Sequence, residues 1–123
     1  MHLRSYFPAI DKAFENGSML VTIHYAQDIQ ENRDIKFDQM PTNLERHTPI
    51  GYFYIDHDYD IDALLSKIFY TFQGEIWSPN GEAHDTIRMA HNVWHTSMSI
   101  GDVVEIGGIA YACCWKGWKK MRK

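Results

Sequence analysis

The last quarter of the chain carries the clearest alternation of apolar and polar positions. Residues 103–106 are β-branched apart from one glutamate, which favours a half-buried strand. Gly107-Gly108 follows, and two glycines accept the positive φ angles of a two-residue hairpin turn. Residues 109–115 then alternate large apolar side chains with Ala and Cys, and residues 118–122 alternate again after Lys116-Gly117. We therefore predict a three-stranded β-meander at this end of the chain.

The same reasoning predicts further elements upstream. We expect strands over residues 19–25 and 50–55, and helices over residues 8–16, 60–72 and 82–91. The helix over 60–72 has the strongest pattern, because its apolar residues form one stripe, Asp60 is a suitable N-cap and Gly74 a suitable stop. Residues 26–48 are polar and mixed in charge, and they predict one long connection.

This order of elements predicts an α+β fold. We expect a small antiparallel sheet with a C-terminal β-meander, covered by two or three short helices. A small barrel made mainly of the C-terminal strands is the alternative. The chain of 123 residues has the size of one domain, so residues 1–123 are expected to fold as a single unit.

Several segments of the last 50 residues resemble a known family. They are Trp77-Ser78-Pro79-Asn80-Gly81-Glu82, then His95 to Val104, then Gly108 to Tyr111, and finally Gly117-Trp118. Together they are similar to the C-terminal signature of the YodL-like proteins, small chains associated with phages, plasmids and other mobile elements. The resemblance covers roughly residues 75–120, and it implies a genomic setting rather than a chemistry. It supplies no catalytic residues.

Composition narrows the class of protein. The hydrophobic share of 45% and the aromatic share of 14% are typical of a folded globule. The longest apolar run, residues 109–115, is far too short to span a membrane, and the first residues lack the apolar core of a signal peptide. We therefore expect a cytoplasmic protein with no membrane partner. Cys113 and Cys114 are adjacent and point to opposite faces of a strand, so we expect no disulfide between them.

Charge is unevenly distributed along the chain. The net charge is −4, but residues 116–123 carry five of the 12 basic residues and no acid. Residues 1–115 therefore hold seven bases and 16 acids, a net charge of −9. An acidic body repels the nucleic-acid backbone, so we do not expect nucleic acid to be the main direct partner. A homodimer is compatible with a small sheet whose edge strands need cover.

Acidic residues alternate in the segment that precedes the strongest helix. The four are Asp56, Asp58, Asp60 and Asp62. The spacing is that of a calcium loop, but Ile61 replaces the required Gly and Lys67 the final Glu, which argues against calcium. An acidic helix start accounts for the pattern through the helix dipole. The alternative is an acidic surface presented to a basic surface of a partner.

Three histidines and the basic tail are the remaining candidates. His84, His91 and His95 share one stripe of an extended helix, which makes them a candidate metal or catalytic group. No Glu follows His91, so the pattern is not that of a zinc protease. The tail combines aromatic and basic side chains, namely Trp115, Trp118, Lys119 and Lys120. Such a surface binds single-stranded nucleic acid or a protein partner, or it is a solvated end whose rings lie on the sheet.

These observations rank three functions. The first is a non-catalytic protein-binding module of a mobile element, without cofactor or metal, that inhibits a host defence complex of the CRISPR or restriction type. Its partner would be a host protein or ribonucleoprotein complex, contacted through Asp56, Asp58, Asp60, Asp62 and the tail residues. The second is a nucleic-acid-binding accessory protein that uses the tail. The third is a metal-dependent enzyme built around His84, His91 and His95.

Overall fold

The computed structural model describes residues 1–27, 43–93, 95–114 and 116–121. In chain order its elements are α1 (Leu3–Tyr6), α2 (Pro8–Ala13), β1 (Met19–Ala26), β2 (His47–Ile55), α4 (Ile61–Thr71), α5 (Gly74–Trp77), the π-helix η1 (His84–Met89), β3 (Val103–Ile106), β4 (Ile109–Cys114) and β5 (Gly117–Lys120). The predicted α+β class is confirmed. The predicted connection over residues 26–48 lies partly outside the described residues, and its two ends belong to β1 and β2.

The five strands form one antiparallel sheet in the order β2-β1-β3-β4-β5. The C-terminal meander is confirmed, and β3 adds to the sheet by pairing with β1. Gly107 and Gly108 have φ angles of 57° and 85°, as a tight turn between β3 and β4 requires. The two ends of the sheet are therefore β2 and β5, with three strands between them.

Strand β2 begins three residues earlier than predicted. It starts at His47 and passes through Pro49, which has no backbone N–H group to donate to a neighbouring strand. An edge strand tolerates such a residue, and the β1–β2 register shifts between Ile23 and His24, opposite the proline. Sequence patterns around a proline indicate the end of a strand, whereas here the strand continues past it.

The strongest predicted helix is confirmed as α4. The side chain of Asp60 accepts a hydrogen bond from the Ala63 N–H at 3.1 Å and caps the first turn. Helix α2 ends before the predicted residue 16, because Phe14 becomes extended and packs its ring against Phe53, 5.0 Å between centroids. The predicted helix over 82–91 forms only the six-residue η1, and the four-residue helices α1 and α5 were not predicted.

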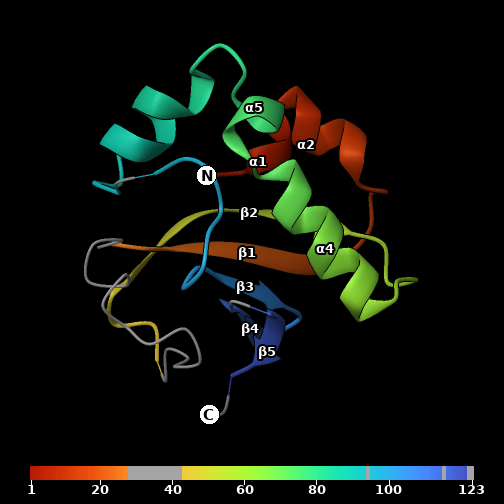
Figure 1. The fold of residues 1–123 in the computed structure, drawn as a ribbon. Helices are drawn as coiled ribbons and strands as arrows, with labels where there is room; N and C mark the ends of the chain where they lie inside the picture. The colour runs from red at the N-terminus through yellow and green to blue at the C-terminus, as the bar shows by residue number, and fades with distance from the viewer. Residues whose placement is uncertain (28–42, 94, 115, 122–123) are drawn as a thin grey trace.

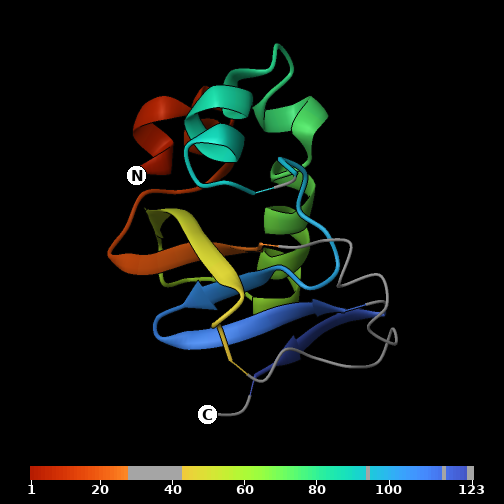
Figure 2. The ribbon, with the colours of Figure 1, turned by 90° about the vertical axis from the view of Figure 1, so that its left-hand side faces the viewer.

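The core lies between the sheet and the helices. Figure 1 shows α4 crossing in front of the sheet, with α1, α2 and α5 gathered above β2, and Figure 2 shows the same arrangement from the side. Val21, Ile23 and Tyr25 of β1 are fully buried, as their predicted common face requires. Leu65 and Ile68 of α4 pack into the same cluster. Among the described residues, no helix is both long and apolar enough to cross a membrane.

One buried carboxylate connects the sheet to the segment that leads into β3. Asp102 is completely buried and accepts three hydrogen bonds. They come from the Ala26 N–H at 2.9 Å, the Ser99 N–H at 2.8 Å and the His95 Nε2–H at 2.8 Å. His95 also stacks on the Tyr25 ring, with centroids 4.4 Å apart. The carboxylate therefore joins the end of β1, the segment over residues 95–99 and the start of β3.

The same segment is anchored to the helical layer. The carbonyl of Thr96 accepts hydrogen bonds from the Tyr25 hydroxyl at 2.7 Å and from the Trp77 indole N–H at 3.0 Å. The Gly74 N–H donates to Ser97 Oγ at 2.7 Å. Thr96 and Ser97 thus link β1 to α5, and Asp102 fixes the far end of that link.

We expect Asp102→Ala to destabilise the protein by about 3–5 kcal/mol, because two buried N–H groups and the ring of His95 lose their hydrogen-bond acceptor. Urea unfolding followed by circular dichroism measures the change. Asp85→Ala is the matched control, since that side chain is 91% exposed and its removal should change the stability by less than about 0.5 kcal/mol. Equal stabilities of the two variants would contradict this role for Asp102.

Candidate functional site

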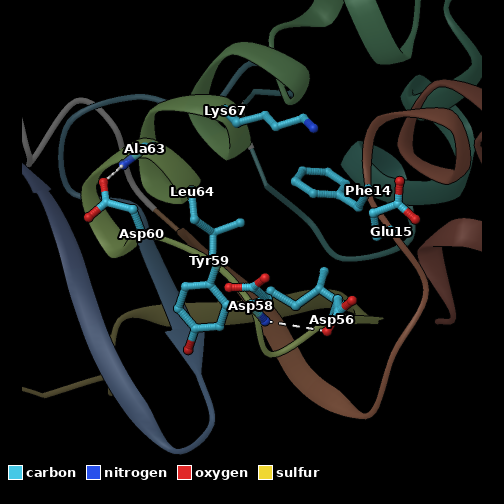
Figure 3. A pocket seen from close by; sticks show the side chains of 10 residues that line it. Phe14, Glu15, Asp56, Asp58, Tyr59, Asp60, Ala63, Leu64 and Lys67 are labelled. Atoms are coloured by element: carbon cyan, nitrogen blue, oxygen red, sulfur yellow. Dashed lines mark hydrogen bonds between the residues drawn. The ribbon is translucent and has the colours of Figure 1, made fainter.

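The alternating acidic residues lie at an open hollow where β2 ends and α4 begins. The hollow has a volume of about 380 Å³. Its lining residues come from β2, from α4, from the segment between them and from the segment that follows α2, and they are Phe14, Glu15, Ile55, Asp56, Asp58, Tyr59, Asp60, Ala63, Leu64 and Lys67. Figure 3 shows these side chains grouped around the start of α4. Asp62, the fourth predicted acid, is exposed in the first turn of α4 and does not line the hollow.

Backbone contacts hold the acidic segment against the end of α2. The Asp56 N–H donates to the Glu15 carbonyl at 3.2 Å, and Asp56 Oδ1 accepts the Asp58 N–H at 3.3 Å. A Cβ atom at Gly17 would lie 2.6 Å from the Asp56 nitrogen, so only glycine permits this close approach. His57 is hydrogen-bonded to Ser18 Oγ at 2.6 Å. Two segments about 40 residues apart in the sequence therefore form one wall.

The hollow carries a strong negative charge over an apolar floor. Among the described residues, four carboxylates line it, from Glu15, Asp56, Asp58 and Asp60, and Lys67 is the one basic lining residue. The Lys67 ammonium lies 5.3 Å from the centre of the Phe14 ring. Figure 3 shows both side chains. Within the described ranges, no ion pair neutralises the four carboxylates. Such a surface suits a long basic side chain, whose methylenes pack on the floor while its charge meets the carboxylates.

Sequence reasoning missed part of this site. Glu15, Phe14 and Lys67 belong to it, and no local pattern connects them with residues 56–60. The only local signal for Lys67 was its failure to match the last position of a calcium loop. Asp60 serves as the helix cap and as a lining residue at once, so the structural and the binding interpretations of the acidic segment are compatible.

The basic tail residues lie at the opposite edge of the sheet. Trp115 is outside the described residues. Trp118 is half-buried and packs against the core, while Lys119 and Lys120 of β5 are exposed. Strands β2 and β5 are four strand spacings apart, which corresponds to about 19 Å. The predicted acidic and basic partner-binding residues therefore do not form one compact patch.

The three candidate histidines have separate surroundings. His84 is exposed and pairs with Asp85 at 3.0 Å, whereas His95 is hydrogen-bonded to Asp102. His91 lies beyond the end of η1, and burial lowers its pKa. No three His, Cys, Asp or Glu side chains of the described ranges are grouped so that they could hold a metal ion. The histidine hypothesis thus gains no geometric support from this part of the chain.

A different histidine is buried in the sheet. His24 of β1 is only 8% exposed, and its Nε2 atom lies 3.3 Å from Glu105 Oε1 on β3. Burial lowers the pKa of His24, and the nearby His47 acts in the same direction, whereas Glu105 opposes both. Cys113 is also buried, and burial raises the pKa of its thiol to about 12. Neither cysteine forms a disulfide.

Comparisons of the chain with models of known families, with curated proteins and with solved structures found no match. The resemblance to YodL-like proteins stays a prediction. Function therefore has to be argued from the acidic hollow and the surfaces next to it.

We expect Gly17→Ala to destabilise the protein by about 1–3 kcal/mol, because the added methyl group would collide with the backbone of Asp56. The collision would also shift the wall that carries the carboxylates. Urea unfolding measures the loss, with the exposed neighbour Asn16→Ala as control, for which we expect a change below about 0.5 kcal/mol. A Gly17→Ala protein as stable as its control would show that the close approach is not required.

We expect the stability to fall as the pH drops below about 6.5, the ordinary pKa of histidine. The pKa of His24 is lower in the folded state than in the unfolded one, so the unfolded state binds a proton first and is favoured in acid. Thermal unfolding at pH 7.5 and at pH 5.5, each about one unit from that value, should give a smaller difference for His24→Gln than for the wild type. An equal difference in both proteins would contradict the assignment.

Proposed function

We propose that this protein is a non-catalytic protein-binding module, whose acidic hollow receives a basic side chain from the surface of its partner. The observation that carries the proposal is the set of four carboxylates with no ion pair among the described residues, placed above Phe14, Ile55 and Leu64. A basic group from outside would meet these carboxylates at short range, where opposite charges attract each other most strongly.

The charge distribution supports a partner that binds nucleic acid. Residues 1–115 carry a net charge of −9, and proteins that grip phosphates expose Lys and Arg in grooves. An acidic module occupies such a groove in place of the phosphates. In the mobile-element setting that the YodL-like resemblance implies, the partner would be a host defence protein or ribonucleoprotein of the CRISPR or restriction type.

The test is capture of a partner from a lysate of the native host, with a tagged wild type and two double variants. Asp56→Asn with Asp58→Asn removes two charges of the hollow. Glu75→Gln with Asp85→Asn removes two exposed charges that do not line it. We expect the wild type and the second variant to capture the same protein, and the first variant to lose at least about tenfold, since two charge-assisted contacts disappear.

Salt provides the second measurement. Capture through exposed charges should weaken strongly when the salt is raised to about 0.5 M, because screening shortens the range of the interaction. Expression of the wild type should also protect an incoming plasmid from a defence system of the host, and the Asp56→Asn/Asp58→Asn variant should not. Equal capture by both double variants would exclude the hollow as the binding site.

A further inference from the structure

Two exposed rings of β2 and one half-buried ring beside the strand form a cluster shortly before the acidic hollow in the chain. They belong to His2, Tyr52 and Tyr54, and we call them the ring cluster. His2 meets Tyr52 edge to face with centroids 5.3 Å apart, and it lies 6.3 Å from Tyr54. The two tyrosine rings are 6.1 Å apart and nearly perpendicular. Each tyrosine is 37% exposed, although the residues between and beside them in β2 are buried.

The ring cluster is held by two distant segments of the chain. The Tyr52 N–H donates to the Met1 carbonyl at 3.0 Å, and His2 forms a parallel bridge with Tyr52. His2 Nδ1 is hydrogen-bonded to Ser5 Oγ at 2.8 Å. The first residues therefore cover the backbone of β2 at Tyr52. A partner cannot add a strand at that point, and the ring faces are what this surface presents to it.

The ring cluster is close along the chain to the acidic hollow. Tyr54 and Asp56 are separated by one residue, so their Cα atoms are at most about 7 Å apart. Arg4, the basic residue that contacts β2 at Tyr54, is not free, because its side chain binds Asp11 at 3.0 Å and the Tyr54 carbonyl at 3.1 Å. A partner that follows β2 therefore meets aromatic faces first and carboxylates next.

We propose that the ring cluster and the hollow bind one extended, arginine-bearing segment of the partner. The guanidinium group is planar and stacks on aromatic rings, whereas the compact, strongly hydrated ammonium of lysine stacks less well. Carboxylates bind the same group through paired hydrogen bonds. Arginine is thus the side chain that suits both halves of the surface. This inference rests on the proposed function and specifies the partner's chemistry.

The probes are fluorescent hexa-arginine and hexa-lysine peptides, which carry equal charge. An extended hexapeptide is about 20 Å long, which is the most that residues 52–58 could span. Fluorescence anisotropy at about 50 mM salt, where exposed charges are weakly screened, measures the affinity of each peptide. The ring variant is Tyr52→Ser with Tyr54→Ser. Its control is Tyr70→Ser with Met89→Ser, which removes side chains that are 64% and 62% exposed. Thermal unfolding checks that every variant is folded.

We expect the wild type and the control to bind hexa-arginine about threefold more tightly than hexa-lysine, and the ring variant to bind both equally. Asp56→Asn with Asp58→Asn should weaken the binding of both peptides by the same factor. If both peptides bind equally, and only the Asp substitutions matter, the inference on arginine is wrong and the acidic hollow stands. If the Asp substitutions weaken binding no more than Glu75→Gln with Asp85→Asn, the proposed function fails, and the inference fails with it.

Discussion

The fold depends on one buried carboxylate, both of whose oxygens accept hydrogen bonds. Asp102 has no solvent contact, and an unpaired carboxylate in that place would be strongly destabilising. Its oxygens instead accept from the end of β1, from the backbone of Ser99 and from His95. The meander is a local structure, and the helices pack on it only through contacts between distant segments. The carboxylate fixes the segment over residues 95–99, through which Thr96 and Ser97 reach Trp77 and Gly74.

Elements that rest on local patterns could be predicted from the sequence, and elements that rest on distant contacts could not. The Gly-Gly turn and the stripe of α4 are encoded within a few residues, and the structure confirms both. Helices α1 and α5 have four residues each, too few for an apolar period, and they form because Leu3 and Trp77 are buried in the core. The end of α2 was also set from a distance, by the contact of Phe14 with Phe53.

The binding surface divides in the same way. The alternating carboxylates are visible in the sequence, but a charge pattern does not show what it faces. Glu15 and Phe14 reach the hollow because the chain passes close to Asp56 at Gly17, and the ring cluster exists because residues 1 and 2 lie along β2. Both features depend on contacts between residues that are far apart in the sequence. In the tail, the lysines are exposed, as the charge pattern suggests, but Trp118 packs against the core, which the local pattern does not show.

The two edge strands of the sheet differ in what covers them, and this affects whether molecules pair edge to edge at high concentration. Residues 1–4 lie along β2, whereas β5 carries Lys119 and Lys120 on its exposed margin. Two molecules that joined β5 to β5 would bring ammonium groups together, and this repulsion opposes sheet growth from one molecule to the next. Lysines on an edge strand are thus one feature that disfavours the joining of many copies into fibrils. This repulsion between the lysines of β5 needs no ligand.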